Sequence, residues 1–191
     1  MTRKIKRPAR QRWVWLICAI VLALLIVADH NGWLLVKNTD DMSAYHGRST
    51  LVTRVIDGDT IEIDLEDALN NRPTTRIRLW GIDCPETAKP DQAGEPFAVE
   101  ATGFTRSLVS GSRVTLLLES HRTRGTFGRV LAHVQLPDHS NLNEALLSAG
   151  LAAIDERWSH SLLGRYAQLQ QAAKRSELGI WASKTNPTSD D

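Results

Sequence analysis

Residues 55–63 have the sequence VIDGDTIEI, in which apolar β-branched residues stand on both sides of an Asp-Gly-Asp turn. This pattern is typical of two strands joined by a tight turn. Asp57 and Asp59 are two residues apart, so in extended chain their side chains leave the same face. An Asp-Gly pair alone is more often only a turn, but here it predicts a hairpin with two carboxylates at its rim.

The rest of the chain predicts three more strands and about three helices. Strands are expected where β-branched and other apolar residues lie between turn residues, at 75–82, 113–118 and 129–136. Helices are expected where apolar residues recur at three or four positions, ending near Gly111, Gly150 and Gly179. Five strands with interspersed helices predict an α+β domain with a five-stranded OB-type barrel over residues 51–182.

The N-terminus has the composition of a membrane-directed segment. Residues 1–12 hold six basic residues and no acidic residue, and residues 13–28 carry no charge. Residues 1–12 are therefore predicted to be a basic cytoplasmic flank, and 13–36 a single transmembrane helix. A cleaved signal peptide, with an apolar region of about 7–15 residues, is the alternative.

Either interpretation places the chain after residue 37 outside the cytoplasm. The expected location is the inner or plasma membrane, with a single span and an extracytoplasmic domain, or secretion if the segment is cleaved. Residues 37–50 are polar and of mixed charge, which predicts a tether, and residues 183–191 predict a polar tail.

The net charge of +1 hides an acidic domain, because the 17 basic and 22 acidic residues after residue 12 give −5. Such a domain is not drawn to a polyanion over long range, so nucleic-acid binding would need a local cluster. Cys18 and Cys84 are not expected to form a disulfide. The six histidines form no HExxH or Cys/His motif, so the sequence predicts no zinc site.

A second acidic cluster follows the third predicted strand, where Asp83 and Glu86 occur in the sequence GIDCPE. Arg78 and Asp83 would face opposite sides of a regular strand, so a bend near Gly81 is required if both serve one site. Arg129 follows Phe-Gly much later in the chain. Carboxylates suit a hard cation and arginines suit a phosphate, so the set points to phosphodiester chemistry.

The chain resembles the staphylococcal nuclease (thermonuclease) family over about residues 51–182. Six segments carry the resemblance in order: VIDGDTIEI, RIRLWGIDCPET, VEATGFTRSLV, TFGRVLAHV, LNEALLSAGLA and LGIW. The resemblance implies that Asp59, Asp83 and the backbone carbonyl of Cys84 bind Ca²⁺. It also implies that Arg78 and Arg129 grip the phosphate and that Glu86 orients or deprotonates the attacking water. Asp57 and Thr60 are expected to support these residues.

The implied activity is Ca²⁺-dependent hydrolysis of DNA and RNA with little sequence preference, leaving 3′-phosphates, with no obligate protein partner. The alternative is a catalytically inactive OB-fold module, tethered to the membrane, that binds nucleic acid or protein. Two departures from the family pattern are Cys84, which places a thiol beside the metal, and Phe127, which lacks a phenolic hydroxyl. Arg124 is expected to be a solvated charge, and Trp80 a core residue.

Overall fold

The computed structural model describes residues 13, 21, 40–88, 90–157 and 159–182. The described residues from 40 onward belong to one compact unit. The predicted basic flank 1–12, membrane segment 13–36 and tail 183–191 lie outside the described residues, apart from Trp13 and Val21. Within the described part of the chain, no helix is both long and apolar enough to cross a membrane.

Five strands close into a barrel in the order β1-β2-β3-β6-β5. They are β1 (Ser49–Asp57), β2 (Thr60–Ile63), β3 (Thr75–Leu79), β5 (Arg113–Leu117) and β6 (Val130–Gln135). β3 and β6 pair in parallel, whereas the other neighbours pair antiparallel. The predicted α+β class and five-stranded barrel are confirmed, and the strand order is OB-like.

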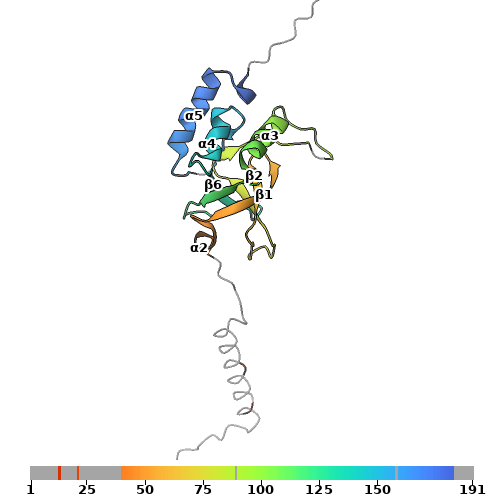
Figure 1. Cartoon of the computed structure of the whole chain (residues 1–191), viewed down its shortest axis with the longest axis vertical. Helices are drawn as coiled ribbons and strands as arrows, with labels where there is room; N and C mark the ends of the chain where they lie inside the picture. Colours follow the sequence, from red (N-terminus) through yellow and green to blue (C-terminus); the bar gives the residue numbers. More distant parts are fainter. Residues whose placement is uncertain (1–12, 14–20, 22–39, 89, 158, 183–191) are drawn as a thin grey trace, which may run out of the picture. The chain divides into compact units, whose positions relative to one another are not determined.

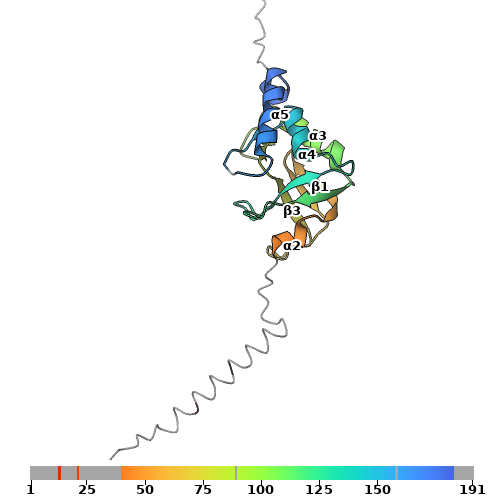
Figure 2. The same cartoon turned by 90° about the vertical axis from the view of Figure 1, so that its left-hand side faces the viewer.

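Three longer helices lie outside the barrel strands: α3 (Ala98–Val109), α4 (Leu142–Ser148) and α5 (Leu163–Arg175). Asn141 caps α4, as its side-chain oxygen accepts a hydrogen bond from the Glu144 amide. A 3₁₀ turn, η1 (Gly179–Trp181), follows α5. In both views α4 and α5 lie toward one end of the barrel, and the short helix α2 (Asp41–Tyr45) lies at the other (Figures 1 and 2).

The predicted tether over residues 37–50 is wrong for residues 40–50. Asp40 caps α2 by accepting a hydrogen bond from the Met42 amide, and β1 already begins at Ser49. Asp41 is buried, and its carboxylate forms an ion pair with Arg124, 83 residues later. A polar stretch whose charges are paired this far along the chain cannot be distinguished from a linker by composition.

The third predicted strand breaks at Trp80 and Gly81. β3 ends at Leu79. After Trp80 and Gly81, the chain forms the two-residue strand β4 (Ile82–Asp83), which pairs with β7 (Ala153–Ile154) outside the barrel. Gly81 has φ +73°, a conformation that glycine adopts without steric cost. The bend required near Gly81 is therefore confirmed, as is the core position of Trp80, which is 2% exposed.

Candidate active site

The two acidic turns pack directly against each other. A Cβ atom at Gly58 would lie 2.8 Å from Cβ of Cys84 and 2.9 Å from Cβ of Ala101, so only glycine fits there. The Thr105 hydroxyl on α3 also donates a hydrogen bond of 2.6 Å to the Gly58 carbonyl. Gly58 is thus both a turn residue and the contact that lets the second acidic cluster approach the first.

Asp59 is the buried member of the site, with 6% of its surface exposed. Its Oδ2 accepts a hydrogen bond from the Cys84 amide at 2.8 Å, and its Oδ1 accepts one from the Thr60 hydroxyl at 3.1 Å. Asp57 supports the turn by accepting a hydrogen bond from the Asp59 amide at 3.3 Å. Burial raises the pKa of Asp59 to about 7, against the opposing effect of Arg78. Even with Arg78 in contact, this carboxyl group is less readily ionised than a free aspartate, and a bound cation would favour its charged form.

Arg78 shows how close the two carboxylates lie. Its Nη1 contacts Oδ2 of Asp59, and its Nη2 contacts Oδ1 of Asp83. Because both nitrogens belong to one guanidinium group, Asp59 and Asp83 are arranged around a single cationic centre. Burial also raises the pKa of Asp83, although its side chain is 58% exposed. The spatial convergence required by the sequence analysis is therefore present.

These donors fit a calcium ion by their chemistry. Asp59 and Asp83 offer carboxylate oxygens, which hard cations prefer, and Asp83 is open to solvent that could supply water ligands. The Cys84 carbonyl immediately follows Asp83 in the chain, and the amide of the same residue is already bonded to Asp59. Cation binding would also offset the unfavourable burial of the Asp59 charge.

Arg129 lies beside this pair and is connected to it through Thr60. Its Nη1 donates a hydrogen bond of 3.0 Å to the Thr60 hydroxyl, which in turn bonds Asp59. Burial lowers the pKa of Arg129, and the nearby positive charge of Arg78 lowers it further. Two guanidinium groups that repel each other at a cavity wall provide a favourable environment for an anion.

Glu86 is held by its backbone at the start of the loop before α3. Its amide donates a hydrogen bond of 2.9 Å to Oε2 of Glu95, and the Glu95 amide donates one of 2.9 Å to the Glu86 carbonyl. These two hydrogen bonds hold the two ends of the loop from residue 86 to residue 95 together. Glu95 is thus a positioning residue that the sequence analysis missed, because a glutamate before Pro-Phe has no distinctive signal.

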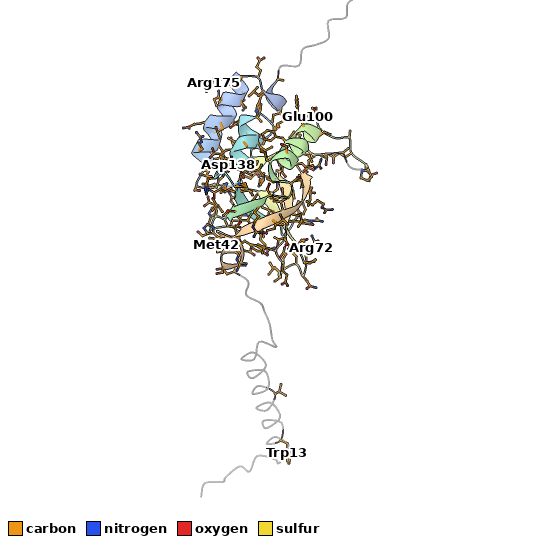
Figure 3. All side chains as sticks on the ribbon, viewed as in Figure 1. Trp13, Met42, Arg72, Glu100, Asp138 and Arg175 are labelled. Carbon is orange, nitrogen blue, oxygen red and sulfur yellow. The ribbon has the colours of Figure 1, made fainter. Side chains whose placement is uncertain are left out.

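Two adjacent cavities open onto the site, of about 300 Å³ and about 330 Å³, and Glu86, Phe127 and Arg129 line both. Arg78 and Asp83 line the smaller one. Arg72, at the turn between β2 and β3, lines the larger one (Figure 3). The guanidinium and carboxylate groups therefore face space that can hold a charged substrate.

Asp155 and Arg157 also line the smaller cavity and were not predicted. Their side chains form a two-point ion pair with both contacts at 2.7 Å. They follow the two-residue strand β7, which is too short to be recognised in the sequence.

The Cys84 thiol is less reactive than expected for a cysteine beside the candidate metal site. The residue is 6% exposed, and burial together with the Asp59 charge raises the pKa of the thiol. The thiolate is the reactive form, so this cysteine stays protonated and is protected from oxidation.

Comparison with known proteins identifies the family of this chain. The family profile described as Staphylococcal nuclease homologue matches residues 76–183. A protein named Thermonuclease from Staphylococcus intermedius is 35% identical over 170 residues, covering 87% of this chain and 94% of that protein. The Thermonuclease of Staphylococcus hyicus is 35% identical over 133 residues, covering 69% of this chain and 75% of its own. A protein described as an uncharacterized endonuclease from Escherichia coli is 34% identical over 137 residues, covering 72% of this chain and 77% of its own. The chain therefore belongs to the staphylococcal nuclease family.

Proposed function

We propose that the protein is a Ca²⁺-dependent nuclease that hydrolyses phosphodiester bonds of DNA and RNA with little sequence preference. The observation that carries the proposal is the convergence of Asp59 and Asp83 on one cationic centre, beside a cavity lined by Glu86 and Arg129. Nuclease relatives that cover most of the chain support the same activity.

Each residue has a physical role in this proposal. Asp59, Asp83 and the Cys84 carbonyl would hold Ca²⁺, which polarises a phosphoryl oxygen and offsets its developing negative charge. Arg78 and Arg129 would donate hydrogen bonds to the phosphoryl oxygens, where charge increases in the transition state. Glu86 would orient a water molecule or accept its proton. By resemblance, attack would break the bond to the 5′ oxygen and leave a 3′-phosphate.

The test of this proposal is digestion of single-stranded DNA and RNA by the full chain, with millimolar Ca²⁺ and with chelator. We expect cleavage only with Ca²⁺, and a loss of kcat of about 100- to 10,000-fold for Glu86→Gln, the range for a general acid–base group. Glu100→Gln is the matched control, because Glu100 is exposed on α3 (Figure 3). A wild-type protein that binds DNA without cutting it would instead indicate the inactive OB-fold module.

Phe127 provides a surface for unspecific contact with bases. Its side chain is 83% exposed beside both cavities, with Cζ of Arg129 at 5.7 Å from the ring centroid. Aromatic rings stack on any base, which suits binding without sequence preference.

We expect Phe127→Ala to raise KM for single-stranded DNA by about 5- to 160-fold, equivalent to the roughly 1–3 kcal/mol of one base stack. The kcat value should change little, because a hydrocarbon ring offers no hydrogen bond or charge to the reacting phosphate. Phe127→Trp, which keeps an aromatic face, is expected to retain the wild-type KM. An alanine variant with unchanged KM would exclude stacking at this position.

We further propose that residues 13–36 anchor the protein in the inner or plasma membrane, with the nuclease domain outside the cytoplasm. The uncharged run after a basic flank supports this location. A reporter active only outside the cytoplasm, fused to the C-terminus, should give signal, and membrane fractionation should separate an anchored from a secreted protein. No signal from this reporter, together with signal from a reporter that is active only in the cytoplasm, would show that the topology is the reverse of the proposed one.

A further inference from the structure

A second cluster of metal-binding side chains lies apart from the two acidic turns. Glu119 follows β5, His133 lies on β6, and His160 precedes α5. Each residue offers one ligand atom, and these three atoms lie within 4.8 Å of one another. Two imidazoles and one carboxylate form a common ligand set for zinc.

His160 is the residue that points to a missing ligand. It is 7% exposed, and both of its ring nitrogens are buried without a hydrogen-bond partner. Such orphaned groups are rare, because burying a polar atom without a partner is costly. The ring also packs on Gly81, where a Cβ atom would overlap Nε2. The imidazole therefore has no protein partner for either nitrogen, and an ion or a water molecule would have to satisfy them.

His133 and Glu119 already have nearly the spacing that a tetrahedral ion requires. Nε2 of His133 lies 3.4 Å from Oε1 of Glu119. Metal–ligand bonds of about 2.0–2.1 Å at a tetrahedral angle place neighbouring ligand atoms about 3.3 Å apart. One edge of the coordination polyhedron is thus close to the required length, and the ligand atom of His160, within 4.8 Å of the other two, would need to approach by up to about 1.5 Å.

Contacts behind the cluster would hold these ligands in orientation. Nδ1 of His133 lies 2.7 Å from the Tyr166 hydroxyl, so a proton on Nδ1 can be donated there while Nε2 keeps a free lone pair. Oε1 of Glu119 accepts hydrogen bonds from the Ser161 amide at 2.8 Å and the Ser161 hydroxyl at 2.5 Å, so an ion bound to Oε1 would displace the Ser161 hydroxyl. Metal-binding histidines and carboxylates usually have such outer partners.

The electrostatic environment favours the neutral imidazoles that a metal needs. Burial and the neighbouring His160 lower the pKa of His133 to about 4, and burial lowers the pKa of His160. Burial acts to raise the pKa of Glu119, but hydrogen bonds from the Ser161 hydroxyl and amide hold it below its usual value. At neutral pH the three groups are thus two neutral bases and one anion.

We propose that Glu119, His133 and His160 bind one Zn²⁺ ion, with water as a further ligand, at a site separate from the calcium site. Imidazole nitrogens favour zinc over Ca²⁺, which prefers oxygen donors. Glu119 is 18% exposed at its side chain and gives the ion a route from solvent. The ion would connect β6 to the segment before α5, and through His160 it would support the bend at Gly81.

The test is calorimetric titration of the full chain with Zn²⁺, together with the absorption spectrum of the Co²⁺-substituted protein. The background carries Asp59→Asn, which weakens cation binding at the acidic turns. We expect one Zn²⁺ per chain, a tetrahedral Co²⁺ spectrum and a higher Tm with zinc. His160→Gln and Glu119→Gln should each weaken the affinity by about 100-fold or more, above the 10- to 100-fold cost of losing an outer partner.

His121→Gln is the matched control, because His121 is 54% exposed and its Nδ1 lies 4.0 Å from Oε2 of Glu119. This variant should keep wild-type zinc affinity. The proposal is overturned if the background protein binds no Zn²⁺, or if His160→Gln and Glu119→Gln bind it normally. Loss of binding in His121→Gln would also overturn the assignment of ligands. The Co²⁺ spectrum needs no variant at the cluster, so it remains decisive even if His160→Gln does not fold.

Discussion

Replacing Arg129 with lysine is expected to lower kcat for nucleic-acid hydrolysis by about 100- to 1,000-fold, the cost of losing one preorganised donor to a developing charge. Lysine keeps the positive charge but loses the planar fork that contacts two phosphoryl oxygens at once. Arg129 is half-buried beside Arg78 and faces the two cavities, and it bonds the Thr60 hydroxyl that supports Asp59. The loss should therefore appear in kcat more than in KM.

The control for this change is Arg106→Lys, because Arg106 is exposed on α3. Initial rates on single-stranded DNA, with circular dichroism to confirm the fold, separate a catalytic from a structural effect. An Arg129→Lys variant that is folded and within threefold of wild-type kcat would remove Arg129 from the proposed mechanism.

Arg124→Met is expected to lower the free energy of unfolding by about 3–5 kcal/mol, the range for breaking a buried ion pair from one side. Arg124 contacts both carboxylate oxygens of Asp41 at 2.7 and 2.8 Å and Oδ2 of Asp67 at 3.0 Å. Asp41 and Asp67 are both buried, and methionine would leave their charges without this partner. The variant also loses the hydrogen bond of 2.8 Å from Arg124 to the Gly128 carbonyl.

Urea denaturation of the full chain measures this effect, with Arg106→Met as the surface control. The midpoint should fall for Arg124→Met and stay near wild type for Arg106→Met. A loss below about 1 kcal/mol, the usual value of an exposed ion pair, would show that Arg124 is solvated, as the sequence analysis predicted. The structure contradicts that prediction, because the Arg124 side chain is 12% exposed and lies between two buried aspartates.

The barrel was predictable because its signals are local. The Asp-Gly-Asp hairpin sits between alternating apolar residues, and α3 and α4 each end two residues before the predicted Gly111 and Gly150. The bend at Gly81 could also be predicted from the spacing of Arg78 and Asp83. These residues are five apart, so on a regular strand their side chains would face opposite sides and could not share one site.

The features that were missed depend on contacts between distant residues. Asp41 looks like part of a polar linker until Arg124 is placed against it. The cluster of Glu119, His133 and His160 has no motif spacing, because only closure of the barrel and the approach to α5 bring these residues together. Composition and periodicity describe a residue's neighbours in sequence, whereas both of these arrangements arise from tertiary packing.

The central claim is that Asp59 and Asp83 bind the same calcium ion, and calorimetric Ca²⁺ titration of the full chain tests it directly. We predict one Ca²⁺ per chain with a dissociation constant on the order of 10⁻⁴ to 10⁻³ M. Asp59→Asn and Asp83→Asn should each weaken that one site, while Asp64→Asn, at an exposed position, should not. Wild-type affinity in either of the first two variants, or two ions lost separately, would contradict the account.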